Sequence, residues 1–290
     1  MSEPLLSVRG LARHFPLYAP GVRRRVAGVS KAVDDVSFEL ASGESLGLVG
    51  ESGSGKTTTA RCILRAMDPT AGEVLFRLPD GRRVDLAKLS SGELKPIRQH
   101  AQMIFQDPFS SLNPRMTVRD IVGEPLVIHR VARGAELDAR VSEILQRVGL
   151  KPEHRSRYPH AFSGGQRQRI GIARALIMRP SLIVCDEATS ALDVSVQAQV
   201  LDLLQELQRE FRLTYLFVTH NLDVVRGFCD RVAVMRKGRI VELASTTEIF
   251  SAPQHPYTKI LLSAVPSPDP DLPMNFNIGE ELARLDAMTS

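Results

Sequence analysis

Residues 45–58 read SLGLVGESGSGKTT, and this stretch decides the expected fold. It begins with the short apolar run Ser45–Val49, passes through a glycine-rich loop and becomes helical in pattern from Lys56. A strand, a G-x-x-x-x-G-K-S/T loop and a helix in this order are typical of sites that hold a nucleotide's phosphates. The glycines let successive backbone N–H groups point at phosphate oxygens, and the helix adds its positive end.

The side chains of this loop supply the charge and the metal ligand that a bound nucleotide needs. Lys56 is expected to contact the β- and γ-phosphates, and the hydroxyl of Thr57 is placed to ligate Mg2+. A glycine loop without any ligand is the competing interpretation, and the flanking strand and helix disfavour it. The residues expected to bind ATP here are Gly50, Glu51, Ser52, Gly53, Ser54, Gly55, Lys56, Thr57 and Thr58.

A second segment whose side chains could take part in a reaction is LIVCDE at Leu182–Glu187, an apolar run that ends in two carboxylates. Such a run is expected where a buried strand meets a phosphate site. Asp186 can hold the Mg2+ shell, and Glu187 can act as a general base toward an attacking water. A strand that ends in Asp-Glu is common, so this prediction depends on the phosphate loop in the same chain.

A third segment, FSGGQRQ at Phe162–Gln168, predicts another anion site. Ser163 is expected to be the N-cap of a helix that runs from about Gly165 to Met178. Its hydroxyl, the glycine N–H groups and the helix N-terminus can bind a phosphate. A capped helix with a flexible entry is the alternative for this segment alone. Two separate phosphate-binding segments in one chain suggest one nucleotide held between two bodies.

Short apolar strands alternate with amphipathic helices, which predicts an α/β fold with a mostly parallel sheet covered on both faces. Residues 107–178 are helical in pattern and form a lobe inserted between two core strands. The expected strands lie at residues 5–9, 33–40, 45–49, 101–105, 182–185 and 213–218, with a β-rich stretch at 72–86 and a hairpin over 232–243. The expected helices include residues 56–67, 165–178 and 196–211.

The chain is expected to divide into an ATPase domain, residues 1–250, and a proline-rich extension, residues 251–290. Residues 16–30 carry proline, glycine and three consecutive arginines, which predicts a surface loop. The extension contains prolines at a density that predicts a tail lying on the surface or partly loose.

The composition favours a folded cytosolic protein. The chain has 290 residues, of which 43% are hydrophobic and 24% are charged, enough for one substantial core. A net charge of +4 and a pI of about 9.1 suit a solvated surface, phosphate ligands or an anionic membrane surface. The three cysteines lack C-x-x-C spacing, which argues against a disulfide framework or a zinc site. No signal peptide and no apolar run near the ~20 residues of a membrane span are expected, so any work at a membrane requires a partner.

The three segments together resemble the ATP-binding subunit of an ATP-binding cassette (ABC) transporter. Gly50–Thr57 resembles the Walker A motif, and Leu182–Glu187 resembles the Walker B motif with its catalytic glutamate. Phe162–Gln166 resembles the family signature, with Phe162 where leucine is usual. The resemblance covers about residues 5–265. It implies a P-loop NTPase fold with a mostly parallel central sheet, an N-terminal antiparallel β subdomain and an inserted α-helical subdomain.

Further positions follow from the same resemblance. Gln106 resembles the Q-loop glutamine, which touches Mg2+ or the attacking water and senses the membrane partner. His220 resembles the switch histidine near the γ-phosphate, and Phe15 falls where an aromatic ring stacks on adenine. Without the resemblance, Gln106 and His220 would be interpreted as solvated side chains at strand ends. The D-loop, which communicates across a dimer, corresponds to Ser190, Ala191, Leu192 and Asp193.

The resemblance also implies a mechanism and partners. Two such subunits pair head to tail, closure over ATP tightens the dimer and hydrolysis reopens it. Coupling helices of two integral-membrane permease subunits are expected in a groove between about Gln106 and Glu124. The implied location is the cytoplasmic face of the plasma membrane, with no nucleic-acid partner. The residues that cover the other subunit's ATP are Ser163, Gly164, Gly165 and Gln166.

A finer resemblance is to the peptide/nickel importer branch. It rests on FQDPFSSLNPR at Phe105–Arg115 and on HPYTKILLSAVP at His255–Pro266. In that branch two related ATPases usually serve one importer, with two permeases and an extracytoplasmic substrate-binding protein. ATP and Mg2+ are the implied cofactors. Some members carry a C-terminal cysteine cluster for an iron–sulfur centre, and no cysteine follows Cys229 here, so no such centre is expected.

Three other classes compete with an importer subunit. A soluble ABC-type ATPase acting on DNA or ribosomes is disfavoured, because the chain shows neither sustained heptads nor a second cassette. A regulatory module without turnover is disfavoured by the presence of both Glu187 and His220. An exporter is possible, although exporters often fuse the cassette to membrane helices. The transported solute and the choice between a homodimer and a pair with a sister ATPase stay open.

Overall fold

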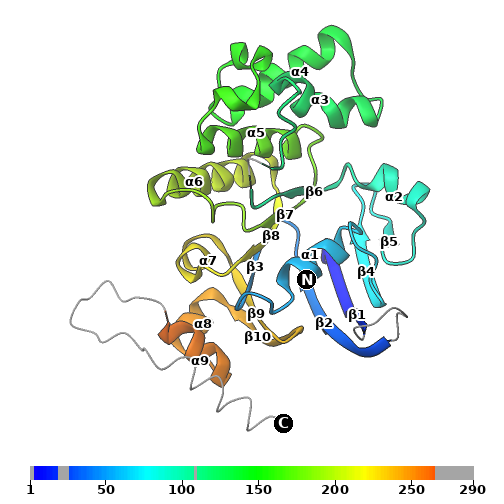
Figure 1. The fold of residues 1–290 in the computed structure, drawn as a ribbon, viewed down its shortest axis with the longest axis vertical. Helices are drawn as coiled ribbons and strands as arrows, with labels where there is room; N and C mark the ends of the chain where they lie inside the picture. Colours follow the sequence, from blue (N-terminus) through cyan, green and yellow to red (C-terminus); the bar gives the residue numbers. More distant parts are fainter. Residues whose placement is uncertain (1–2, 19–25, 108–109, 265–290) are drawn as a thin grey trace, which may run out of the picture.

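The computed structural model describes residues 3–18, 26–107 and 110–264, which form an α/β fold on two sheets (Figure 1). The larger sheet has the strand order β10-β9-β3-β8-β7-β6. All of its pairings are parallel apart from that of β9 with β10, which confirms the mostly parallel sheet. Its strands are β3 (Ser45–Val49), β6 (Ala101–Ile104), β7 (Leu182–Asp186), β8 (Thr214–Thr219), β9 (Arg231–Arg236) and β10 (Arg239–Ser245).

Both faces of this sheet are buried, as parallel strands with cover on each side require. Strands β3, β7 and β8 are buried at every residue. Alternate residues of β8 point into two different hydrophobic clusters, Tyr215 and Phe217 into one and Leu216 and Val218 into the other. The first cluster includes helices α6 and α7, and the second includes α1 and the smaller sheet. The covering helices are α1 (Lys56–Ile63), α6 (Val194–Phe211) and α7 (Leu222–Phe228).

The smaller sheet is antiparallel and has the order β2-β1-β4-β5, as the resemblance implied. The loop expected at residues 16–30 is wrong in its described part, because β1 continues to Tyr18 and β2 begins at Val26. Pairing of β1 with β4 ends at Ala12, so Pro16 lies where β1 has only β2 beside it. A proline fits such an edge position because its missing N–H is not needed there. The arginines at 23–25 lie outside the described residues. The strands are β1 (Leu6–Tyr18), β2 (Val26–Leu40), β4 (Ala71–Arg77) and β5 (Arg83–Asp85).

A helical lobe is inserted between β6 and β7 and forms the upper part of the molecule in Figure 1. It contains α3 (Val118–Ile128), α4 (Gly134–Arg147) and α5 (Gly164–Leu176). Helix α4 buries one apolar face, and Gly149 follows it in a left-handed conformation with φ of 73°. The lobe packs onto the sheet through α5, which contacts both β6 and α6.

Sequence patterns missed four short helices. Three of them are α2 (Ser91–Ile97), α7 and α8 (Thr246–Ser251). The fourth, α9 (Pro256–Ser263), corrects the expectation of a surface tail, because Tyr257 is only 1% exposed and belongs to the core. Proline at the first helical position begins this helix, since its missing N–H is not needed there. Residues 265–290 of the extension lie outside the described residues.

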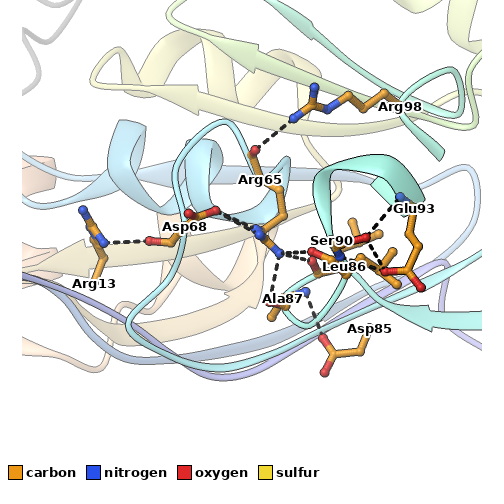
Figure 2. Close-up of polar contacts among 10 residues, drawn as sticks. Arg13, Arg65, Asp68, Asp85, Leu86, Ala87, Ser90, Glu93 and Arg98 are labelled. Atoms are coloured by element: carbon orange, nitrogen blue, oxygen red, sulfur yellow. Dashed lines mark hydrogen bonds and ion pairs between the residues drawn. The ribbon is translucent and has the colours of Figure 1, made fainter. Parts of the chain in front are cut away.

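The sequence predicts that this first helix continues to residue 67, but α1 ends at Ile63. It ends there because the chain turns at Arg65, which has φ of 51°. The Arg65 guanidinium then ties this turn to the segment before α2 (Figure 2). Its Nη1 donates to the carbonyl oxygens of Leu86 (2.6 Å), Ala87 (2.9 Å) and Leu89 (3.2 Å). Its Nη2 donates to Asp68 at 2.9 Å. The helix that carries Lys56 is thereby fixed at its far end.

Candidate nucleotide site

The glycine-rich loop lies between β3 and α1, and its backbone explains the glycines. Gly50, Gly53 and Gly55 have φ of 150°, 80° and 104°. A Cβ on Gly50 would lie 2.1 Å from the carbonyl oxygen of Met235, and a Cβ on Gly55 would lie 2.1 Å from that of Ala32. Side chains would therefore force the loop away from β2 and β9. The predicted strand–loop–helix order is confirmed.

Lys56 is the buried cation of this loop. Its side chain is 4% exposed, and Nζ donates to the carbonyl oxygens of Gly50 and Glu51 at 2.7 Å each. Burial lowers the pKa of Lys56, while the carboxylates of Glu187, Asp186 and Glu51 oppose that shift. The ammonium therefore sits at the entrance of α1, where it can meet phosphate oxygens.

Thr57 and Asp186 meet across the site. The Thr57 hydroxyl donates to Asp186 Oδ1 at 2.8 Å, which joins the first turn of α1 to the end of β7. Burial raises the pKa of Asp186, and the hydrogen bond from Thr57 opposes that shift. Two oxygen ligands beside a phosphate loop fit Mg2+, which binds through one or two protein oxygens together with substrate phosphates.

Glu187 is held between two residues distant in sequence. Gln106 Nε2 donates to Glu187 Oε2 at 2.9 Å, and His220 Nδ1 lies 3.2 Å from Oε1. Gln106, Glu187 and His220 follow the carboxyl ends of the adjacent strands β6, β7 and β8, the edge of a parallel sheet where ligands bind. Glu187 itself has φ of 49°, an uncommon conformation for a non-glycine residue. Its N–H donates to the carbonyl of Val218 at 2.8 Å, which holds that conformation.

The predicted signature segment begins α5 as expected. Ser163 is the N-cap, and its hydroxyl and backbone form a capping box with Gln166. A Cβ on Gly165 would lie 2.5 Å from Val196 Cγ1, so this glycine permits close packing of α5 on α6. Figure 1 shows α5 in the helical lobe, apart from α1 and its phosphate loop. The structure thus does not bring Ser163–Gln166 to the chain's own loop.

The predicted D-loop connects Glu187 to α6. The Ser190 hydroxyl donates to the carbonyl oxygen of Glu187 at 3.0 Å. Asp193 is the N-cap of α6 and accepts the N–H of Val196 at 2.9 Å. Ala191 is exposed, and Leu192 packs against the core. The segment therefore runs from the carboxylate to the surface beside α5.

Phe15 lies in β1, opposite Ser30 of β2. Its ring is half-buried, with the Arg13 guanidinium carbon 4.6 Å from the ring centroid. Stacking of Phe15 on adenine stays a prediction.

One residue of the site was missed by sequence reasoning. Tyr257 of α9 accepts the backbone N–H of Glu51 at 3.1 Å, so the extension contacts the phosphate loop. The run at His255–Pro266 is similar to the importer branch, but its composition gives no signal of this contact.

Comparison with known proteins identifies the family. Residues 33–190 match the ABC transporter family. The chain belongs to the ABC transporter family. Residues 241–289 of this ABC protein also match the C-terminal region of oligopeptide/dipeptide transporters.

Several named ATP-binding proteins and solved ATP-binding cassettes are similar to this chain. The oligopeptide transport ATP-binding protein OppF of Bacillus subtilis is 54% identical over 276 residues, 95% of this chain and 87% of OppF. The glutathione import ATP-binding protein GsiA of Shigella flexneri is 50% identical over 97% of this chain, which spans 46% of GsiA, about half of that relative's length. The dimeric, post-hydrolysis structure of the ATP-binding cassette MJ0796 with ADP and Pi superposes with a TM-score of 0.69. That pair is 29% identical, and the match covers 83% of this chain and 98% of the other.

Two features of the described ranges bear on this ABC protein's surroundings. None of the helices within residues 3–18, 26–107 and 110–264 has the length and apolar composition for crossing a membrane. The same residues contain no group of three or more His, Cys, Asp and Glu side chains arranged to hold a metal ion.

Proposed function

We propose that this ABC protein is the ATP-hydrolysing, energy-coupling subunit of an importer for peptides or similar small solutes. The observation that carries the proposal is the position of Glu187, held by Gln106 and His220 beside Asp186 and the phosphate loop. A non-hydrolysing nucleotide module has no need for a carboxylate fixed in this way.

Each polar group of the site has a task in hydrolysis. The loop N–H groups and Lys56 bind and orient the phosphates. Glu187 accepts the proton of the attacking water as a general base. His220 lies where it can contact the γ-phosphate, and Gln106 orients the carboxylate. Mg2+, when bound, neutralises phosphate charge, and Thr57 and Asp186 are the residues that would hold it, with Gln106 nearby.

A second ATPase subunit completes the site in this proposal. The chain's own Ser163–Gln166 segment lies away from its own phosphate loop, so a head-to-tail partner has to supply that segment (Figure 1). The dimeric structure of MJ0796, a relative of the same fold, supports such pairing. The capped N-terminus of α5 then faces the γ-phosphate of the partner's ATP. Either a second copy of this chain or a sister ATPase can be that partner.

A groove beside Gln106 offers a place for the membrane subunits. It is a cavity of about 710 Å³, lined by residues of β6, α3 and the turn after α1. Phe105 is 43% exposed there, and the Arg174 guanidinium carbon lies 5.9 Å from its ring centroid. Arg174 also donates to the Ser111 carbonyl oxygen at 2.8 Å. A helix of a permease subunit that contacts Phe105 acts on the residue next to Gln106, and through Gln106 on Glu187. The groove thus links docking to the general base.

The kind of importer follows from the relatives. The match at residues 241–289 and the names of OppF and GsiA support peptides or peptide-like solutes. The proposed assembly holds two ATPase subunits, two permeases and an extracytoplasmic substrate-binding protein, with this chain at the cytoplasmic face of the membrane. Cys62, Cys185 and Cys229 are free and buried. The expectation of no iron–sulfur centre stays a prediction, which iron analysis can test.

Co-purification tests the proposal. The tagged chain, extracted from its native cells in mild detergent, is expected to recover integral-membrane subunits and to hydrolyse MgATP. Addition of the cognate binding protein with its solute should increase the hydrolysis rate. Recovery of ribosomes or nucleic acid in place of membrane subunits would contradict the proposal and favour a soluble ABC-type ATPase.

A further inference from the structure

Helix α9 lies against the outer side of the phosphate loop. Tyr257 is 1% exposed and is among the largest fully buried side chains. Its Oη accepts the N–H of Glu51 at 3.1 Å, and Glu51 directly follows Gly50 in the loop. The Arg236 guanidinium carbon lies 5.0 Å from the Tyr257 ring centroid, so β9 holds the ring from another side.

Tyr257 and Lys56 hold opposite ends of the same residue. The N–H of Glu51 donates to Tyr257, and the carbonyl oxygen of Glu51 accepts from Lys56 Nζ at 2.7 Å. The orientation of the peptide groups around Glu51 therefore depends on a residue of the extension and on the phosphate-binding lysine together. Burial raises the pKa of Tyr257, with the backbone hydrogen bond from Glu51 opposing, so the phenol keeps its proton at neutral pH.

Among the described residues, the rest of the loop has few contacts on this side. A cavity of about 140 Å³ is lined by Glu51–Ser54, Arg236, Lys237 and Tyr257. A Cβ built on Gly53 would meet no heavy atom of the described residues within 4 Å. The loop is fastened again at its other end, where the N–H of Gly238 donates to the Ser54 carbonyl oxygen at 2.9 Å. The first half of the loop is thus held by Lys56 from within and by Tyr257 from α9.

We propose that Tyr257 is a positioning residue for the phosphate loop, through which the C-terminal extension sets nucleotide affinity. This inference rests on the proposed function, because it needs a nucleotide at the loop. Without the hydroxyl, the Glu51 peptide samples other orientations, and the nucleotide must first select the competent one. The apparent affinity is the intrinsic affinity multiplied by the fraction of chains in the competent state, so it falls as that fraction falls.

The size of the effect follows from the hydrogen bond between the Glu51 N–H and the Tyr257 hydroxyl. A hydrogen bond of this kind contributes about 1 kcal/mol, which is a factor of about five in a binding constant. Tyr257→Phe keeps the ring in its packing and removes only the hydroxyl. We expect MgADP to bind the variant about fivefold more weakly. The KM for ATP should rise by a similar factor with kcat within twofold of the parent, because bound nucleotide restores the loop.

The chain offers a matched control in Tyr215. Its ring is fully buried, and its hydroxyl donates to the Leu204 carbonyl oxygen at 3.1 Å, within the core and away from the loop. Tyr215→Phe removes the same chemical group from a comparable environment. It should lower the free energy of unfolding by a similar amount and leave the affinity for MgADP at the parental value.

Calorimetric titration of MgADP into the full 290-residue chain and its two variants gives the test. Amide hydrogen exchange gives an independent measurement, because the Glu51 N–H should exchange about fivefold faster in Tyr257→Phe alone. Parental affinity in Tyr257→Phe, or equal losses in both variants, would overturn the inference and leave the proposed function standing. A parent chain that binds no MgADP would instead refute the proposed function and this inference with it.

Discussion

The turn after α1 gives a stability prediction that can be worked from the structure. Arg65 is 11% exposed, and its Nη1 serves three backbone carbonyl groups in the segment before α2 (Figure 2). Hydrogen bonds from a charged donor contribute about 1.5–3 kcal/mol each. Nη1 carries two hydrogens, so three acceptors count as two bonds, and water can replace part of the loss near the surface. The pair with Asp68, which is 79% exposed, adds at most about 1 kcal/mol.

We therefore expect Arg65→Ala to lower the free energy of unfolding by about 3 kcal/mol. The matched control is Arg82→Ala, because Arg82 is 73% exposed and pairs with Asp80 at the surface. That change should leave the free energy of unfolding close to the parental value, because solvent screens an exposed pair. Urea unfolding followed by far-ultraviolet circular dichroism suits a chain that contains no tryptophan. Equal shifts of the urea midpoint in the two variants would refute the reasoning.

Two further predictions concern the reaction. Lys56→Ala should reduce kcat/KM for MgATP by at least about 100-fold, since it removes the charge that meets the phosphates, whereas Lys88→Ala, 68% exposed, should hydrolyse ATP as the parent does. Near-normal turnover in Lys56→Ala would place the site elsewhere. Glu187→Gln should reduce kcat by about 100- to 10,000-fold and still bind MgATP, because an amide keeps the shape of the side chain and cannot take a proton. Parental rates in steady-state ATPase assays of that variant would show that another group is the base.

The sequence predicted the phosphate loop well because its spacing is dictated by local backbone geometry. Backbone carbonyl groups lie so close to Gly50 and Gly55 that a Cβ would clash with them, so glycine is required at these two positions. The buried strands were also predictable, since an unbroken apolar run such as Leu182–Cys185 fits a strand covered on both faces. These signals lie within a few consecutive residues.

The contacts between distant segments could not be predicted from such patterns. Gln106 and Glu187 are 81 positions apart, and only the adjacency of β6 and β7 brings them within 2.9 Å. Family resemblance selected Gln106 and His220, where composition would have left them as solvated side chains. Proline and glycine in residues 16–30 indicate a loop, yet part of this segment is paired, because a free strand edge removes the penalty for Pro16.

The attachment of α9 bears on where this chain can be divided. The carboxylate of Glu242 in β10 accepts the backbone N–H groups of Gln254 at 2.8 Å and His255 at 3.0 Å. Together with the burial of Tyr257, this places the compositional boundary at residue 250 inside one packed structure. A deletion there would expose apolar core and leave the Glu242 carboxylate without these donors. Exchanging extensions between related ATPases would therefore also exchange the residue that contacts the phosphate loop. Under the proposed role of Tyr257, a chimaera made at that boundary takes its nucleotide affinity from both parents.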